Sequence, residues 1–73
     1  MEKEDILIGK ILEEITVRVS RELNLDTVGV INITGSTNTV DKLYDKSTLF
    51  YKEGVDRIYA ILMQELKTGK MPE

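Results

Sequence analysis

The sequence predicts a mainly α fold, in which two long amphipathic helices form an antiparallel hairpin with an irregular or short β linker. Three observations lead to this prediction. Apolar residues recur every three or four positions near both ends of the chain. The two periodic stretches have similar lengths of about 20 residues. The stretch between them lacks this periodicity, so two helices of matched length, each with one apolar stripe, are expected to pack against each other.

The first helix is predicted over residues 3 to 23. Acidic residues in its first turn favour the positive end of the helix dipole, and Asn24 suits the left-handed position after the last turn. The alternation of apolar and polar residues over 15–20 also fits a half-buried strand. We favour the helix because a strand would leave the earlier periodicity unexplained. The apolar stripe consists of Ile8, Ile11, Leu12, Ile15, Val19 and Leu23.

The middle segment, residues 27 to 34, is rich in β-branched residues and contains Gly29. This composition predicts a short strand or an extended loop. A small α+β fold with a short strand near 28–33 is therefore the alternative architecture. Such a strand needs a partner strand, and its own copy in a second subunit is the clear candidate.

A turn and a short helix are expected after this segment. The helix is predicted over residues 39 to 46, with Ser36 or Asn38 as its N-cap. The turn that begins at Gly35 could be imagined as a phosphate-binding loop. It lacks the lysine and the glycine spacing of a P-loop, so a turn followed by a helix cap is the preferred interpretation.

The C-terminal helix is predicted over residues 48 to 68, and Gly69 and Pro72 are expected to end it. Its apolar spacing continues backwards to Tyr44, so one unbroken helix from about residue 38 is an alternative. That rod would be roughly 45 Å long, beyond the roughly 29 Å breadth of a globule of this size, and would need a partner helix. The apolar face holds Tyr51, Val55, Ile58, Tyr59, Leu62 and Leu66.

The composition excludes several kinds of chemistry. The 73 residues include no Cys and no His, so disulfides, thiolate nucleophiles, zinc fingers and histidine relays are ruled out. We therefore expect a protein that is not an enzyme, with no catalytic residue, no cofactor and no metal site. Asp41 and Asp45 lie one helical turn apart and would be the first pair to test for Mg²⁺, although ordinary surface charge is the preferred interpretation.

Charge and hydropathy indicate a single cytoplasmic domain over residues 1 to 73. The net charge is −3, and no stretch forms a basic groove or a polyacidic tail. The first residues lack the basic start and the apolar core of a secretory signal. No apolar run reaches the roughly 18 residues that a membrane span requires, so no membrane contact is expected.

The small size of the chain predicts self-association. Surface scaling gives roughly 7,500 Å² buried on folding, which stabilises the fold by on the order of 110 kcal/mol if about 60% of it is apolar. Ordering the chain costs about the same amount. Because the two terms nearly cancel, and neither a disulfide nor a metal site is available to add stability, we expect a homodimer.

The predicted function is that of a small non-enzymatic regulatory or adaptor protein that binds itself and another protein. The alternative is a nucleic-acid-associated regulator or an acidic blocker of a DNA-binding protein. The acidic balance disfavours direct binding, which a basic strip of Lys10, Arg18 and Arg21 would revive. In size and style the chain is similar to small acidic helical proteins of bacteria and their phages, which assigns no residue a role. Residues expected at interfaces are Ile6, Val17, Tyr44, Tyr51, Val55, Ile58, Tyr59 and Leu62.

Overall fold

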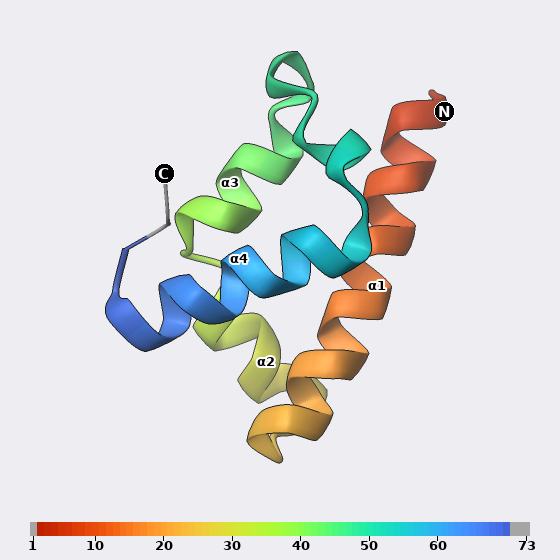
Figure 1. The fold of residues 1–73 in the computed structure, drawn as a ribbon. Helices are drawn as coiled ribbons and strands as arrows, with labels where there is room; N and C mark the ends of the chain where they lie inside the picture. Colours follow the sequence, from red (N-terminus) through yellow and green to blue (C-terminus); the bar gives the residue numbers. More distant parts are fainter. Residues whose placement is uncertain (1, 71–73) are drawn as a thin grey trace.

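The computed structural model describes residues 2–70, and these are mostly helical (Figure 1). The elements in chain order are the helices α1 (Lys3–Leu23), α2 (Thr27–Thr34) and α3 (Asn38–Tyr44), the 3-10 turns η1 (Lys46–Thr48) and η2 (Phe50–Glu53), and the helix α4 (Val55–Thr68). No strand occurs among the described residues. The prediction of a mainly α fold is confirmed, and the α+β alternative is wrong.

Helix α1 has the bounds that the periodicity predicts. Asn24 is left-handed, with φ 53 and ψ 48, and its backbone N–H donates to the carbonyl oxygen of Ser20. Most of the apolar stripe faces the core as expected, so the strand alternative for residues 15–20 is wrong; Leu23, which was also assigned to the stripe, is 40% exposed. The fully buried members of this stripe are Ile8, Ile11, Ile15 and Val19.

Residues 27–34 form helix α2 instead of the predicted strand or loop. The Asp26 carboxylate is the N-cap and accepts a hydrogen bond from the Gly29 N–H at 2.8 Å. Val30 and Thr34, one turn apart, are buried where α2 packs on α1. This cap and this packing outweigh the β preference of the branched side chains, which is a weak guide to structure.

Replacing Asp26 by alanine should lower the free energy of unfolding by about 1 kcal/mol, because the Gly29 N–H then loses its only side-chain acceptor. Urea denaturation followed by circular dichroism measures the change. Glu22→Ala is the control, since Glu22 is exposed and the change should stay within about 0.5 kcal/mol. An unchanged urea midpoint for Asp26→Ala would contradict the capping role.

The turn between α2 and α3 ends in a cap that differs from the prediction. Thr37 is the N-cap of α3, whereas Ser36 or Asn38 was expected. The Thr37 hydroxyl accepts a hydrogen bond from the Val40 N–H at 3.3 Å and donates one to the Thr34 carbonyl oxygen at 2.6 Å. One hydroxyl therefore joins the end of α2 to the start of α3.

The predicted C-terminal helix is broken before Val55. Leu49 and Gly54 have φ values of 57 and 89, and positive φ is incompatible with a continuous right-handed helix. Neither a helix from residue 48 nor one from residue 38 is therefore present. Gly69 ends α4 in a left-handed conformation with φ 80, as predicted. The expected helix breaker Pro72 lies outside the described residues.

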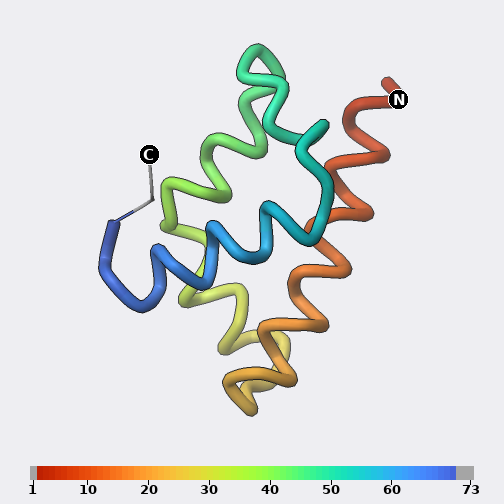
Figure 2. Tube along the Cα trace, viewed as in Figure 1, coloured from red at the N-terminus to blue at the C-terminus, as the bar shows by residue number. Residues whose placement is uncertain are grey.

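The arrangement of the helices differs from a hairpin. Helix α4 begins beside the middle of α1 and runs away from it toward α3 (Figures 1 and 2). An ion pair between Arg18 Nη1 and Asp56 Oδ1, at 2.6 Å, joins α1 to the first turn of α4. Helix α2 lies against the C-terminal part of α1. The segment predicted as a linker is therefore part of the packed fold.

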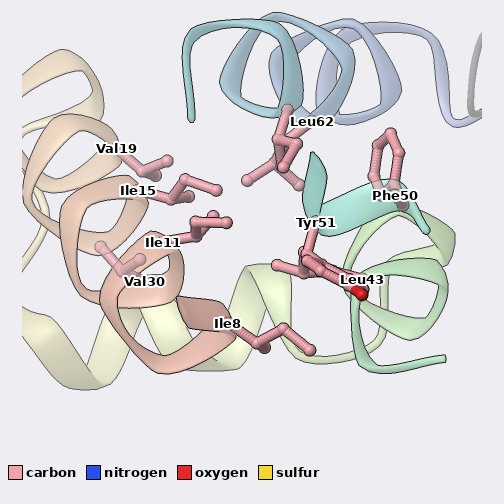
Figure 3. Packing of buried hydrophobic residues seen from close by; sticks show 10 residues of the cluster. Ile8, Ile11, Ile15, Val19, Val30, Leu43, Phe50, Tyr51 and Leu62 are labelled. Atoms are coloured by element: carbon pink, nitrogen blue, oxygen red, sulfur yellow. The ribbon is translucent and has the colours of Figure 1, made fainter. Parts of the chain in front are cut away.

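The core fills the space between α1, η2 and α4. Figure 3 shows Ile11 and Ile15 of α1 pointing toward Tyr51 and Leu62. Leu43 of α3 and Phe50 of η2 close the core on the side away from α1. The buried apolar cluster consists of Ile8, Ile11, Ile15, Val19, Val30, Leu43, Phe50, Tyr51, Ile58 and Leu62.

Candidate interaction surfaces

A groove with a volume of about 450 Å³ lies between α1, α2 and α3, and we call it the α2 groove. Helix α1 contributes a flank on which residues three and four positions apart lie together. Glu13 is the only charged residue among the described residues that line the groove. The apolar and small residues that form it include Gly9, Leu12, Thr16, Ile31, Val40 and Tyr44.

Helix α2 exposes apolar side chains beside this groove. Val28 and Ile31 are 65% and 57% exposed, and Tyr44 of α3 is 61% exposed. Val28 and Ile31 are three positions apart and so lie on the same face of α2. Residues 27–34 contain no charged residue. Exposed apolar side chains grouped on an uncharged helix are typical of an interaction surface.

A second groove, also with a volume of about 450 Å³, lies between α1 and the segment from η2 to the start of α4; we call it the α1–η2 groove. Because successive helical residues are rotated by about 100°, Leu7 and Ile11 lie on the opposite side of the buried stripe from Gly9 and Leu12. The residues that line it include Leu7, Lys10, Ile11, Tyr51, Lys52 and Val55.

The structure distributes the eight predicted interface residues between core and surface. Ile6, Val17 and Tyr44 are exposed. The other five contribute to the core of a single chain: Tyr51, Ile58 and Leu62 are buried, and Val55 and Tyr59 pack against them.

The alternative of one unbroken helix from about residue 38 would place the three tyrosines in that one helix, and this alternative is wrong. Tyr44 lies in α3, Tyr51 in η2 and Tyr59 in α4, because the chain is interrupted at Leu49 and Gly54. Of the three tyrosines, Tyr44 alone lines the α2 groove and Tyr51 alone lines the α1–η2 groove.

Ile6 and Val17 do not form a continuous patch. They are 45% and 41% exposed on the outer face of α1. About three helical turns separate them, and Lys10 and Glu13 lie between them on that face. Single exposed apolar residues among charges are common on folded proteins.

The basic strip of Lys10, Arg18 and Arg21 that would favour nucleic-acid binding is interrupted at its centre. Arg18 donates a hydrogen bond to Asp56 Oδ1 at 2.6 Å and another to Glu14 Oε1 at 3.2 Å. The hydrogen bond to Asp56 is the main cause that raises the pKa of Arg18, and the hydrogen bond to Glu14 raises it further. Two carboxylates therefore accompany the middle cation, and the strip does not provide a run of free charge for a phosphate backbone.

Glu65 is a buried carboxylate that the sequence analysis overlooked. It is 7% exposed, and its two oxygens accept hydrogen bonds from Asn38 N (2.7 Å), Thr39 N (2.8 Å) and Thr39 Oγ1 (2.6 Å). Burial acts to raise the pKa of Glu65, but the bonds from the Thr39 hydroxyl and the two backbone N–H groups bring it below its usual value.

The Glu65 carboxylate completes the cap of α3. It satisfies the first two N–H groups of the helix, and Thr37 supplies the acceptors for the next two. A phosphate at the Gly35 turn would meet this carboxylate, so the turn-and-cap interpretation is confirmed. A sequence signal for Glu65 did exist, because the spacing from Ile58 and Leu62 places it on the buried face of α4.

Three further observations concern the part of the chain that the structure describes. No three acidic side chains there come together to hold a metal ion. The Asp45 carboxylate accepts hydrogen bonds from the N–H and the hydroxyl of Ser47, at 3.1 and 2.6 Å, and so caps η1. Across residues 2–70, no helix combines the length and apolar character needed to cross a membrane.

Comparisons with protein-family models, curated proteins and solved structures found no match. The described residues define a small α-helical protein with an apolar groove on each flank of α1.

Proposed function

We propose that this protein is a small non-enzymatic adaptor or regulatory protein that forms a homodimer through the α2 groove. The observation that carries the proposal is the exposure of Val28 and Ile31 on an uncharged helix, beside a groove whose lining is mostly apolar. Covering these side chains removes apolar surface from water and stabilises the pair.

Electrostatics favours this surface for contact between two copies. Each chain carries a net charge of −3, so two copies repel each other and meet best where charge is sparse. A two-fold interface brings one patch against itself, and a mostly apolar patch, with Glu13 as the one charged residue among the described residues that line its groove, is largely complementary to itself. Ile31 of one copy can then enter the partner's groove near Gly9, where a Cβ atom would have no neighbour within 4 Å.

The size of the surface is adequate for a dimer. A standard interface buries about 800 Å² on each partner. The chain exposes 5030 Å², so such a contact would cover about one sixth of it. The area of one face of a small protein is of this order.

Ile31→Glu should convert the dimer into a folded monomer. The side chain is already 57% exposed, so glutamate at this position is solvated in one chain, whereas in the dimer it would be buried without a partner. We expect the dissociation constant to rise by at least about tenfold. Size-exclusion chromatography with light scattering measures the mass, and circular dichroism checks the fold.

Val17→Glu is the matched control for this experiment. It makes the same kind of change at a side chain that is 41% exposed on the outer face of α1, away from the α2 groove. The variant should remain dimeric. A folded Ile31→Glu protein that still dimerises, or a Val17→Glu protein that does not, would contradict the placement of the interface.

A second candidate function rests on the connection between α2 and α3. Two short helices joined by a three-residue turn that contains glycine have the lengths of a helix-turn-helix motif. The exposed face of α3 carries Asp41, Lys42 and Asp45, a net negative set, and Glu65 occupies its N-terminus. These charges disfavour direct contact with phosphates, so the nucleic-acid-linked alternative takes the form of an acidic blocker of a DNA-binding protein.

A further inference from the structure

We propose that the α1–η2 groove binds an acidic amphipathic helix of a partner protein. This inference goes beyond self-association and does not depend on it. The groove lies on the flank of α1 opposite the α2 groove, so both surfaces can be used together. A dimer formed through the α2 groove would therefore carry two copies of the α1–η2 groove. Such a dimer can hold two partner helices, as an adaptor does.

The floor of the α1–η2 groove is apolar. Ile11 and Tyr51 are nearly buried, whereas Leu7 is 42% exposed and Val55 is partly exposed. Leu7 and Ile11 are one turn apart along α1. At Gly54, a Cβ atom would meet nothing within 4 Å, so the groove is open there. A groove of this kind receives apolar side chains spaced one turn apart on a partner helix.

Among the described residues that line this groove, the charges without an ion pair are positive. Lys10 and Lys52 line it, and neither forms an ion pair with the described part of the chain. The lining carboxylate, Glu14, is held by Arg18 at 3.2 Å. In a chain of net charge −3, this surface is complementary to an acidic partner.

The open shape of the groove favours a helix over a small amphiphilic anion. Sites for small molecules enclose about 70–90% of the ligand surface. The exposed Leu7 and the gap above Gly54 leave the α1–η2 groove open to solvent, so a small ligand would stay largely in water. A helix can bury two anchors here, place carboxylates near Lys10 and Lys52, and keep its polar face solvated.

The test uses a fluorescein-labelled alanine-based peptide of about 15 residues, long enough to form a helix, with two leucines four positions apart and glutamates beside them. Fluorescence anisotropy with the full chain measures its affinity. The double variant Lys10→Glu, Lys52→Glu should lower that affinity by at least about tenfold, since two surface ion pairs are replaced by repulsion. Lys67→Glu, Lys70→Glu makes the same change in net charge at the far end of α4 and should bind as the unmodified protein does.

Further variants and probes distinguish this site from the dimer interface and from a site for a small anion. The Ile31→Glu protein should bind the peptide undiminished, so loss of self-association and loss of this site are distinguishable. Leu7→Glu, at an exposed position, should also weaken binding by at least about tenfold because it places a carboxylate beside the acidic peptide. The proposal is overturned if the acidic peptide does not bind, if a peptide with lysines in place of glutamates binds equally well, or if sodium decanoate binds the groove and the peptide does not.

Discussion

Alanine in place of Leu62 is expected to lower the free energy of unfolding by about 2–5 kcal/mol. Leu62 is fully buried in α4, and Figure 3 shows it in the core beside Tyr51 and opposite the stripe of α1. Removing its branched end leaves a cavity in the apolar cluster that joins α4 to α1 and η2. Since a chain of this size is stabilised by only a few kcal/mol in total, we expect much of the variant protein to be unfolded near 25 °C.

Urea denaturation followed by far-UV circular dichroism measures this effect, with the slope of the transition as a check on two-state unfolding. Leu7→Ala is the matched control. Leu7 lies within the same long helix as the core stripe but is 42% exposed, so its loss should change stability by about 0.5 kcal/mol or less. Equal losses for Leu62→Ala and Leu7→Ala would show that α4 does not complete the core.

Glutamine in place of Glu65 is expected to lower the free energy of unfolding by about 1.5–3 kcal/mol. The carboxylate accepts three hydrogen bonds from Asn38 and Thr39. Glutamine has one oxygen, so its amide nitrogen must face a backbone or hydroxyl donor in a buried place. Glu22→Gln, at an exposed position of α1, is the control and should leave stability nearly unchanged.

The effect of Glu65 should depend on pH in a defined direction. Folding lowers the pKa of Glu65 below its usual 4.5, so the folded state favours the ionised form. Its contribution to stability is therefore fully present above the unfolded value and is lost as the pH falls through the lowered folded value. The difference between the unmodified protein and Glu65→Gln should be largest near pH 7 and shrink below about pH 4. A difference that stays constant with pH would contradict the role of the charge.

Local patterns in the sequence were sufficient for the regular helix ends. The spacing of Ile8, Ile15 and Val19 predicts which face of α1 is buried, and Asn24 predicts where the helix stops. Gly69 does the same for α4. In each case the determining contacts lie within one or two turns of the helix, which is the range over which sequence periodicity carries information.

The middle of the chain could not be predicted in the same way. The β-branched residues of 27–34 favour a strand, but Asp26 caps a helix there and Val30 packs into the core. The regular spacing from Tyr44 onward predicts a longer helix. Leu49, however, adopts a positive φ, which is unusual for leucine and cannot be predicted from the residue type. The packing of Val30 depends on distant segments, which periodicity does not record, whereas the Asp26 cap is a local signal that the β-branched composition outweighed in the prediction.

The candidate surfaces were predicted only in part. Tyr44 was expected at an interface, and it does line the α2 groove. Val28 and Ile31 were not recognised, because a strand would have paired or buried them differently. The α1–η2 groove could not be foreseen at all, since it brings Leu7 together with Val55 from a helix whose start was misplaced.

Sedimentation equilibrium of the unmodified protein at micromolar concentration tests the central claim most directly. We expect a mass of twice 8.3 kDa at these concentrations, because the protein is proposed to be a homodimer, with a reversible shift toward the single-chain mass on dilution. A well-folded protein that remains at the single-chain mass throughout would contradict it.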